Sequence, residues 1–134
     1  MKKYHTYSFE KLEVYQNSLQ LSVKIRKIAA KFPAHERYEL TSQLKRAVDS
    51  IGANIAEGAG RASNLDQAHF TNVSFSSGLE VIHHLNLAQL LEYMELETYE
   101  SLRENLDLIL NQLNALYKYQ VKSDQSLKKK TRNG

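Results

Sequence analysis

Apolar residues recur every three or four positions along four stretches of the chain, which is the spacing of amphipathic helices. The pattern predicts helices over residues 9–32, 36–58, 64–92 and 97–121. Short links between helices of similar length make consecutive helices antiparallel neighbours. The sequence therefore predicts an all-α fold, an antiparallel up-down-up-down four-helix bundle that occupies residues 1–122 as one domain.

Residues with capping or helix-breaking chemistry mark the expected ends of these helices. Ser8 is expected to cap the first helix, after a short N-terminal lead-in, and Pro33 to stop it by disfavouring the helical conformation of the residue before it. Ser63 or Asn64 is expected to cap the third helix. Residues 123–134 are polar and basic without periodicity, so a disordered tail is predicted there.

The second predicted helix carries a hydrophilic line beside its apolar face, and the third helix repeats the theme. We call these residues the polar seam: Gln43, Arg46, Ser50, Asn54 and Glu57 on the second helix, and Ser77, Glu80 and His84 on the third. Small neighbours such as Gly52 would let another helix approach closely, so we interpret the seam as a structural network facing protein. Arg46 is expected to pair with Glu80, since buried charge is costly unless paired. A direct ligand or subunit contact is the alternative.

The first helix and the chain ends carry further apolar and aromatic residues that are expected to pack. One ridge of the first helix holds Phe9, Leu12, Tyr15, Leu19 and Val23, and a second holds Leu21, Ile25, Ile28 and Phe32. Tyr4, Tyr7, Tyr117 and Tyr119 lie near the termini. Tyrosines at bundle ends are more often half-buried, although exposed rings would offer bases a stacking surface.

Composition excludes several classes of protein. The chain has no cysteine, so disulfides and thiolate metal sites are impossible. No apolar run approaches the roughly 20 residues that span a bilayer. The charged N-terminus leads into no apolar stretch, so no signal peptide is predicted. These features predict a soluble cytoplasmic protein without a membrane partner.

Catalytic and metal motifs are weak or missing in the sequence. Glu80-x-x-His83 has the spacing of di-iron bundle proteins, which need a second such motif on a facing helix. The comparable Asp66-x-x-His69 lies on the same predicted helix, about 21 Å away. No nucleophile elbow, phosphate loop or dinucleotide fingerprint accompanies them. We therefore expect no catalytic residue, no metal and no cofactor, and hence a protein that is not an enzyme.

Charge is unevenly distributed along the chain. Residues 1–62 carry 11 basic against 6 acidic residues, residues 63–122 carry 3 against 8, and residues 123–134 carry 4 against 1. Oppositely charged neighbouring helices would fix the packing order, which is the simpler interpretation; the alternative is a basic face that meets a polyanion. The candidate nucleic-acid-binding residues are Lys24, Lys27, Lys31, Arg37, Lys45 and Arg61. Without a groove-reading motif, such binding would tolerate any base sequence.

Two strings within the second predicted helix and its approach carry a family resemblance. They read RYELTSQLKRA at residues 37–47 and SIGANIAEG at residues 50–58, with Phe32-Pro33 before them and Ser77-x-x-Glu80 after them. The chain resembles, over roughly residues 8–120, a bacterial four-helix-bundle family encoded in intervening sequences of 23S rRNA genes. That family is related to the accessory variability protein of diversity-generating retroelements. Gly52 and Ser76 stand where the family often has Pro and Gly, which leaves the expected fold unchanged.

The resemblance implies an assembly and a class of partner. Such bundles form homo-pentamers, rings of five subunits around a central channel. The retroelement relatives bind nucleic acid and a reverse transcriptase through basic surface, so the implied partners are further copies of the chain, RNA or DNA, and a reverse transcriptase or other protein. The expected function is therefore non-enzymatic, homo-oligomeric and sequence-tolerant nucleic-acid binding. The alternative is an oligomeric protein–protein interaction scaffold that binds no nucleic acid.

Overall fold

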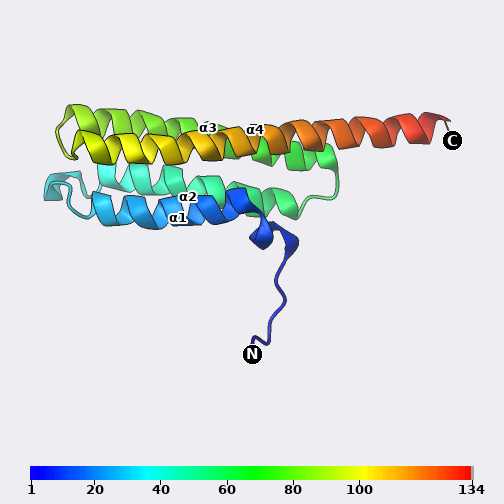
Figure 1. The fold of residues 1–134 in the computed structure, drawn as a ribbon, viewed down its shortest axis with the longest axis horizontal. Coiled ribbons are helices and arrows are strands. Elements are labelled where there is room, and N and C mark those ends of the chain that lie inside the picture. Colours follow the sequence, from blue (N-terminus) through cyan, green and yellow to red (C-terminus); the bar gives the residue numbers. More distant parts are fainter. Residues whose placement is uncertain (134) are drawn as a thin grey trace.

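A computed structural model describes residues 1–133, and the side chains of residues 1–123 among them. The α-helices are α1 (Glu13–Ala29), α2 (Leu40–Ala59), α3 (Asn64–Leu90) and α4 (Leu96–Asn133), and two 3-10 turns, η1 (Ser8–Lys11) and η2 (Ala34–Glu36), precede α1 and α2. Consecutive helices run antiparallel (Figure 1). The predicted all-α four-helix bundle is confirmed. α4 continues to Asn133, whereas the sequence predicted a helix end at residue 121 and a disordered tail over residues 123–134, so the predicted helix end is wrong.

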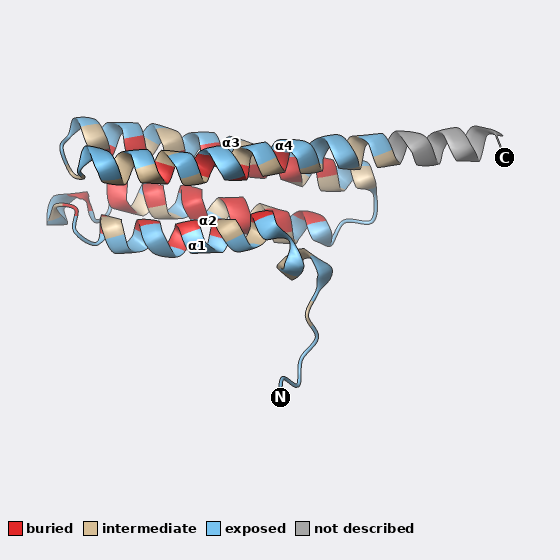
Figure 2. Ribbon diagram, in the orientation of Figure 1, coloured by how far each residue is buried: buried red, intermediate tan, exposed pale blue. Residues whose placement is uncertain are grey.

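The four helices enclose a single apolar core. α2 packs most extensively against α3, α3 against α4, and α1 against α2 and α4. Every helix buries one stripe toward the centre (Figure 2), and the largest fully buried side chains include Leu21, Ile25, Leu44, Ile51, Leu85, Leu102, Leu106, Ile109 and Leu113. Burying each such side chain contributes roughly 1.5–3 kcal/mol to the free energy of unfolding. The apolar residues that recur at helical spacing on each helix therefore supply the core.

The first helix begins later than predicted. Leu12 has extended backbone (φ −66°, ψ 130°), so α1 starts at Glu13, and Ser8 lies inside η1 and makes no capping bond. The break folds Phe9 back onto Tyr15, with the ring centroids 5.0 Å apart in an edge-to-face arrangement. The η1 turn thereby contacts both α1 and α2. The predicted continuous helix from residue 9 and its Ser8 cap are wrong because this tertiary contact outweighs local propensity.

The second helix also begins later than predicted, at Leu40. The α1 helix ends at Ala29, four residues before Pro33, and η2 follows the proline. The Glu36 carboxylate is buried in this link, where it accepts a hydrogen bond from the Tyr93 hydroxyl at 2.7 Å. This hydrogen bond raises the pKa of Tyr93. The predicted start at residue 36 is therefore wrong, because Glu36 faces the α3–α4 link from a turn in front of α2.

The ends of α3 follow the predicted capping chemistry more closely. Ser63 Oγ accepts a hydrogen bond from the Asp66 main-chain N–H at 3.1 Å, which confirms Ser63 as the N-cap. At the other end Glu92 adopts a left-handed conformation (φ 63°), and the Tyr93 N–H donates to the Ala88 carbonyl at 2.9 Å. This is the Schellman arrangement that usually takes glycine.

Part of one expected ridge of α1 does not pack into the core: Tyr15 does, but Leu19 and Val23 do not. The buried face of α1 runs through Val14, Leu21 and Ile25, whereas the Leu19 and Val23 side chains are 48% and 54% exposed. A corner helix of a bundle buries only the face that meets its two neighbours. The prediction that the Leu19–Val23 ridge is part of the core is wrong, and α1 presents apolar surface to solvent.

Candidate nucleic-acid interface

The centre of the polar seam crosses from α2 to α3. Ser50 Oγ and Ser77 Oγ lie 2.8 Å apart and share a hydrogen bond. Asn54 Nδ2 donates to the Ser50 carbonyl at 2.8 Å and to Ser50 Oγ at 2.9 Å. All three side chains are half-buried. The central seam residues thus join two helices, as the spacing of small hydrogen-bonding side chains suggested.

The charged ends of the seam lie in solvent. Gln43, Arg46 and Glu57 are exposed, and within residues 1–123 no ion pair joins Arg46 to Glu80. Glu80 instead faces His84 of its own helix, with Oε2 and Nε2 3.2 Å apart. The expected Arg46–Glu80 pair is wrong because neither side chain is buried, so no desolvation cost requires a partner.

Glu57 pairs with a residue just beyond the end of its own helix. Its Oε1 lies 3.1 Å from the guanidinium of Arg61, one turn further along the chain. The seam is therefore a short half-buried bridge between two helices, with charged ends that are open to water.

Close helix approach surrounds the bridge. A Cβ atom added to Gly52 would lie 2.9 Å from Ser18 Oγ of α1, and Ser74 Oγ of α3 donates to the Ile51 carbonyl at 2.8 Å. A small residue is needed at Gly52 because α1 occupies the space that a side chain would fill. The sequence predicted a close helix approach at Gly52, and the structure shows that the approaching residue is Ser18 of α1.

An ionic contact that sequence reasoning missed joins α1 to α2. The Arg26 guanidinium donates hydrogen bonds to both carboxylate oxygens of Asp49, and Ser22 Oγ donates to Asp49 Oδ1 at 2.5 Å. The hydrogen bond from Arg26, with a smaller contribution from Ser22, lowers the pKa of Asp49. The signal available in the sequence is Ser22 and Arg26 one helical turn apart, but it does not reveal which acid on α2 they meet.

Three candidate basic residues lie in one line on α1. Lys24, Lys27 and Lys31 are all exposed, at steps of three and four residues. Lys24 Nζ donates to Ser101 Oγ at 2.9 Å and to Asn105 Oδ1 at 3.2 Å, both on α4. The line therefore contacts α4 through Lys24.

The other candidates are spread over the molecule. Arg37 lies in the α1–α2 link, with its guanidinium 5.7 Å from the Tyr38 ring centroid, and Lys45 is half-buried on α2 near Asp49. Arg61 lies in the α2–α3 link at the opposite end of the bundle, 4.6 Å from the Phe70 ring centroid (Figure 1). A single chain therefore does not gather all six basic residues into one patch.

The terminal tyrosines are exposed. Tyr4, Tyr7 and Tyr119 project into solvent, whereas Tyr117 is only 39% exposed. The interpretation of these rings as half-buried is wrong for Tyr4, Tyr7 and Tyr119, since the N-terminal lead-in leaves the bundle (Figure 1) and Tyr119 lies off the buried stripe of α4. Their exposure leaves the alternative, a stacking surface for bases, available.

Metal and membrane chemistry find no support in the described part of the chain. Residues 1–123 contain no cluster of three or more histidine and acidic side chains placed to hold a metal ion. Among the helices as far as they are described, none combines the length and apolar character needed to cross a membrane.

The geometry defines an all-α antiparallel four-helix bundle with a polar bridge between its second and third helices and a basic line on its first. The family model described as 23S rRNA-intervening sequence protein matches residues 10–115, and the chain belongs to this family. A crystal structure of a protein with unknown function from the S23 ribosomal protein family of Bacteroides thetaiotaomicron is similar, with 27% sequence identity and a TM-score of 0.73. The match covers 78% of this chain and 95% of that one. The comparison with curated proteins gives no match.

Proposed function

We propose that this protein is a non-enzymatic homo-oligomer that binds RNA or DNA through the phosphate backbone, without regard to base sequence. The observation that carries the proposal is the outer face of α1, where apolar and basic side chains lie side by side. A shallow recess of about 430 Å³ on this face is lined by Leu19, Gln20, Val23, Lys24 and Lys27. The apolar residues suit contact with another copy, and the lysines beside them suit a polyanion.

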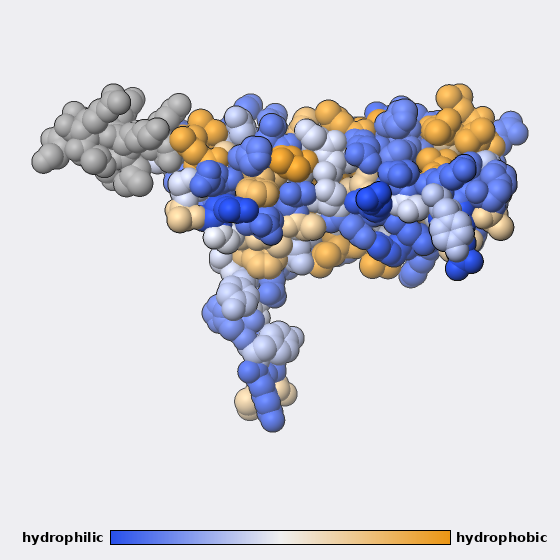
Figure 3. Space-filling model, turned by 180° about the vertical axis from the view of Figure 1, so that it is seen from behind, coloured by the Kyte–Doolittle hydropathy of each residue, from blue (hydrophilic) through white to orange (hydrophobic). Residues whose placement is uncertain are grey.

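Self-association accounts for apolar side chains that one chain leaves in water. Leu19 and Val23 on α1 are joined by exposed Leu87, Leu90 and Leu91 near the α3–α4 turn. Figure 3 shows hydrophobic residues gathered at that end of the opposite face. Exposed apolar surface of this kind commonly marks interaction sites. A ring of five subunits is the assembly that the family resemblance favours.

Oligomerisation would let the modest positive charge of each chain attract a phosphate backbone more strongly. Three lysines on one helix attract a phosphate backbone weakly, but repetition around an assembly turns them into a continuous positive belt. Each neutralised phosphate releases condensed counterions, so affinity for nucleic acid falls steeply with salt. The scatter of basic residues over a single chain is therefore consistent with binding by several subunits together.

The experiment measures solution mass and RNA binding on the same preparations. Light scattering is expected to give a multiple of the chain mass of 15.4 kDa, and gel shifts with a structured RNA are expected to show a complex at low salt. Lys24→Gln, Lys27→Gln and Lys31→Gln together should weaken the complex and keep the mass. A matched control changes Lys2, Lys3 and Lys11, which are also exposed but lie before α1. A monomer that shifts no RNA contradicts the proposal.

The second candidate is an oligomeric scaffold whose partner is another protein, and the apolar recess on α1 favours it. A reverse transcriptase is the partner that the retroelement relationship would suggest, and that relationship is itself part of this proposal. Co-purification of one stoichiometric protein, free of nucleic acid, would favour the scaffold. Purified protein with a high ratio of absorbance at 260 to 280 nm would favour nucleic-acid binding.

A further inference from the structure

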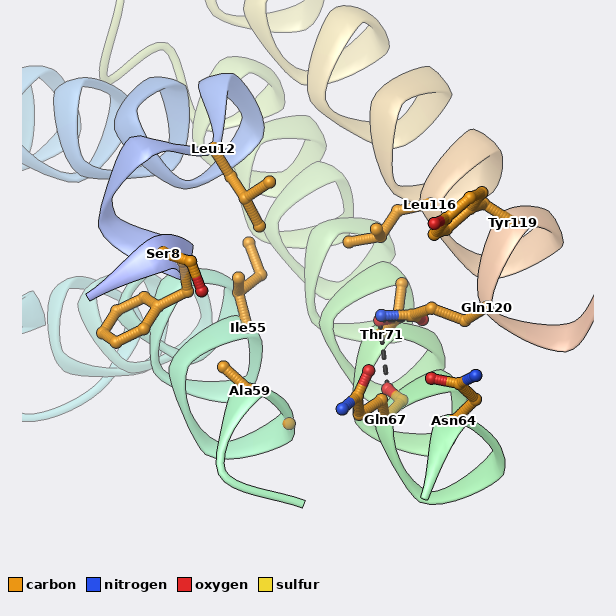
Figure 4. A pocket seen from close by; sticks show the side chains of 12 residues that line it. Ser8, Leu12, Ile55, Ala59, Asn64, Gln67, Thr71, Leu116, Tyr119 and Gln120 are labelled. Carbon is orange, nitrogen blue, oxygen red and sulfur yellow. Dashed lines mark hydrogen bonds between the residues drawn. The ribbon is translucent and has the colours of Figure 1, made fainter. Parts of the chain in front are cut away.

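A cavity of about 320 Å³ opens at the end of the bundle where η1, the C-terminus of α2, the N-terminus of α3 and the later part of α4 meet (Figure 4). Leu12, Ile55 and Leu116 supply apolar side chains to it from three directions. The volume lies near the lower limit of about 300 Å³ for small-molecule pockets. A single flat ring system suits this space better than an extended ligand.

The α3–α4 side of the cavity is polar and held in place by hydrogen bonds. Thr71 Oγ1 lies 2.7 Å from Gln120 Oε1 and 3.1 Å from the Gln67 carbonyl, and Gln67 Nε2 donates to the Arg61 carbonyl at 3.0 Å. These hydrogen bonds occupy the oxygen of the Gln120 amide and the nitrogen of the Gln67 amide. The Gln120 Nε2 donor and the Gln67 Oε1 acceptor have no hydrogen bond within residues 1–123 and line the same cavity.

Among residues 1–123, those that line the cavity are all uncharged. A phosphate, a carboxylate or an ammonium group would find no counter-charge among these lining residues, which favours a neutral ligand. A neutral ring with apolar faces and an edge of donors and acceptors fits, since carboxamide side chains pair with such edges in base recognition. Nucleobases have this chemistry, and single strands present them unstacked.

We propose that this cavity takes one unstacked base of a single-stranded nucleic acid, which rests on the nucleic-acid binding proposed above. Tyr119 lines the cavity with its side chain 69% exposed, so its ring is available to stack on the base or its neighbour. Exposed Lys118 and Lys122 lie one and three residues away on α4, and Arg61 lies at the same end of the bundle. Lys122, about one helical turn from Tyr119, and Arg61, whose guanidinium also pairs with Glu57, are the cations on this side that suit flanking phosphates.

The test uses the full chain and a single-stranded DNA oligonucleotide with one 2-aminopurine, whose fluorescence reports stacking and base contact. Tyr119→Ala is expected to weaken binding about 5-fold to 150-fold, the range found when a base-stacking ring is removed. Tyr119→Phe keeps the ring and should bind as the unchanged protein does. Tyr38→Ala is the matched control, because Tyr38 is 84% exposed at the opposite end of the bundle.

An oligonucleotide of the same length without bases separates this proposal from the proposed function. Tighter binding of the base-containing strand, lost in Tyr119→Ala, supports the cavity as a base site. Equal, salt-sensitive binding of both strands by all variants overturns the base site and leaves phosphate-backbone binding intact. Binding of neither strand overturns both proposals. Thermal unfolding of Tyr119→Ala shows whether the fold is kept, and Gln120→Leu, which removes the amide at the cavity, provides a second variant with the same expected loss.

Discussion

Ser50 of α2 and Ser77 of α3 bring their hydroxyl oxygens to 2.8 Å across the most extensive helix–helix contact of the bundle. Ser50 also receives the Asn54 side-chain amide, so one hydroxyl joins two helices and fixes a third polar group. Neither serine carries charge, so the bridge is formed without the desolvation cost of an ion pair.

Replacing Ser50 by alanine should lower the free energy of unfolding by about 1 kcal/mol, the usual contribution of a partly buried hydrogen bond. Arg46→Ala, four residues away on the same helix, is the matched control and should stay within about 0.5 kcal/mol because Arg46 is exposed. Urea unfolding followed by circular dichroism measures both. Equal losses in the two variants would mean that the bridge does not stabilise the fold.

Glycine at Glu92 should stabilise the protein. Glu92 has a φ of 63°, and a non-glycine residue in this left-handed region costs roughly 1–2 kcal/mol. Part of the gain is offset by the greater freedom of glycine in the unfolded chain, so an increase of about 1 kcal/mol is expected for Glu92→Gly. Glu95→Gly, in the same link, lacks this strain and should give no gain. A lower melting temperature for Glu92→Gly would contradict the assigned conformation.

Gly58 should not tolerate a side chain, whereas Gly60 should. A Cβ atom at Gly58 would lie 2.9 Å from Phe70 Cβ, an atom tied to the α3 backbone, so Gly58→Ala forces the two helices apart. The expected loss is about 1–3 kcal/mol. At Gly60 the nearest atom is the Glu57 carbonyl oxygen at 3.5 Å and φ is −83°, so Gly60→Ala should be neutral or stabilising by about 0.5 kcal/mol. Similar melting temperatures for the two variants would rule out the close approach of α2 and α3.

Asp49 gives stability a pH dependence of defined sign. Arg26 and Ser22 lower the pKa of Asp49 in the folded state, so its contribution is present above the unfolded pKa of about 3.9 and is lost as pH falls through the folded pKa. Because both side chains are nearly half exposed, the contribution at neutral pH is only roughly 0.2–1 kcal/mol.

The check is thermal unfolding of Asp49→Asn and the unchanged protein between pH 2 and pH 7. The two melting temperatures should differ at pH 7 and converge below pH 4. Glu10→Gln, at a carboxylate that makes no ion pair within residues 1–123, is the control and should track the unchanged protein across this range. A constant difference between Asp49→Asn and the unchanged protein would exclude titration of Asp49 as its source.

Sequence patterns predicted the features that depend on neighbouring residues. Four apolar stripes gave the bundle, the Ser63 cap depends on a residue three positions away, and the Ser50 and Ser77 positions follow from helical spacing. The fold could be predicted because the apolar stripe of each helix is visible in its own stretch of sequence.

Features that depend on tertiary packing could not be predicted in the same way. Nothing local breaks the helix at Leu12; the Phe9–Tyr15 contact does. Periodicity marks the Leu19–Val23 ridge as apolar but cannot tell which apolar face meets the other helices. Helix faces alone predict the Arg46–Glu80 pair. Whether the two side chains meet depends on the rotation of each helix, which the packing of the whole core determines.

The most direct test is the salt dependence of affinity for a DNA duplex, measured for the unchanged protein and for Lys24→Gln, Lys27→Gln, Lys31→Gln combined. The logarithm of the binding constant should fall linearly with the logarithm of salt, with a slope of about −0.9 per neutralised phosphate. Removing three lysines from one bound chain would flatten the slope by about 2.7 at most, and a larger change is expected because several subunits contribute. A slope near zero, or one that the lysine changes leave unaltered, would contradict binding through the α1 face.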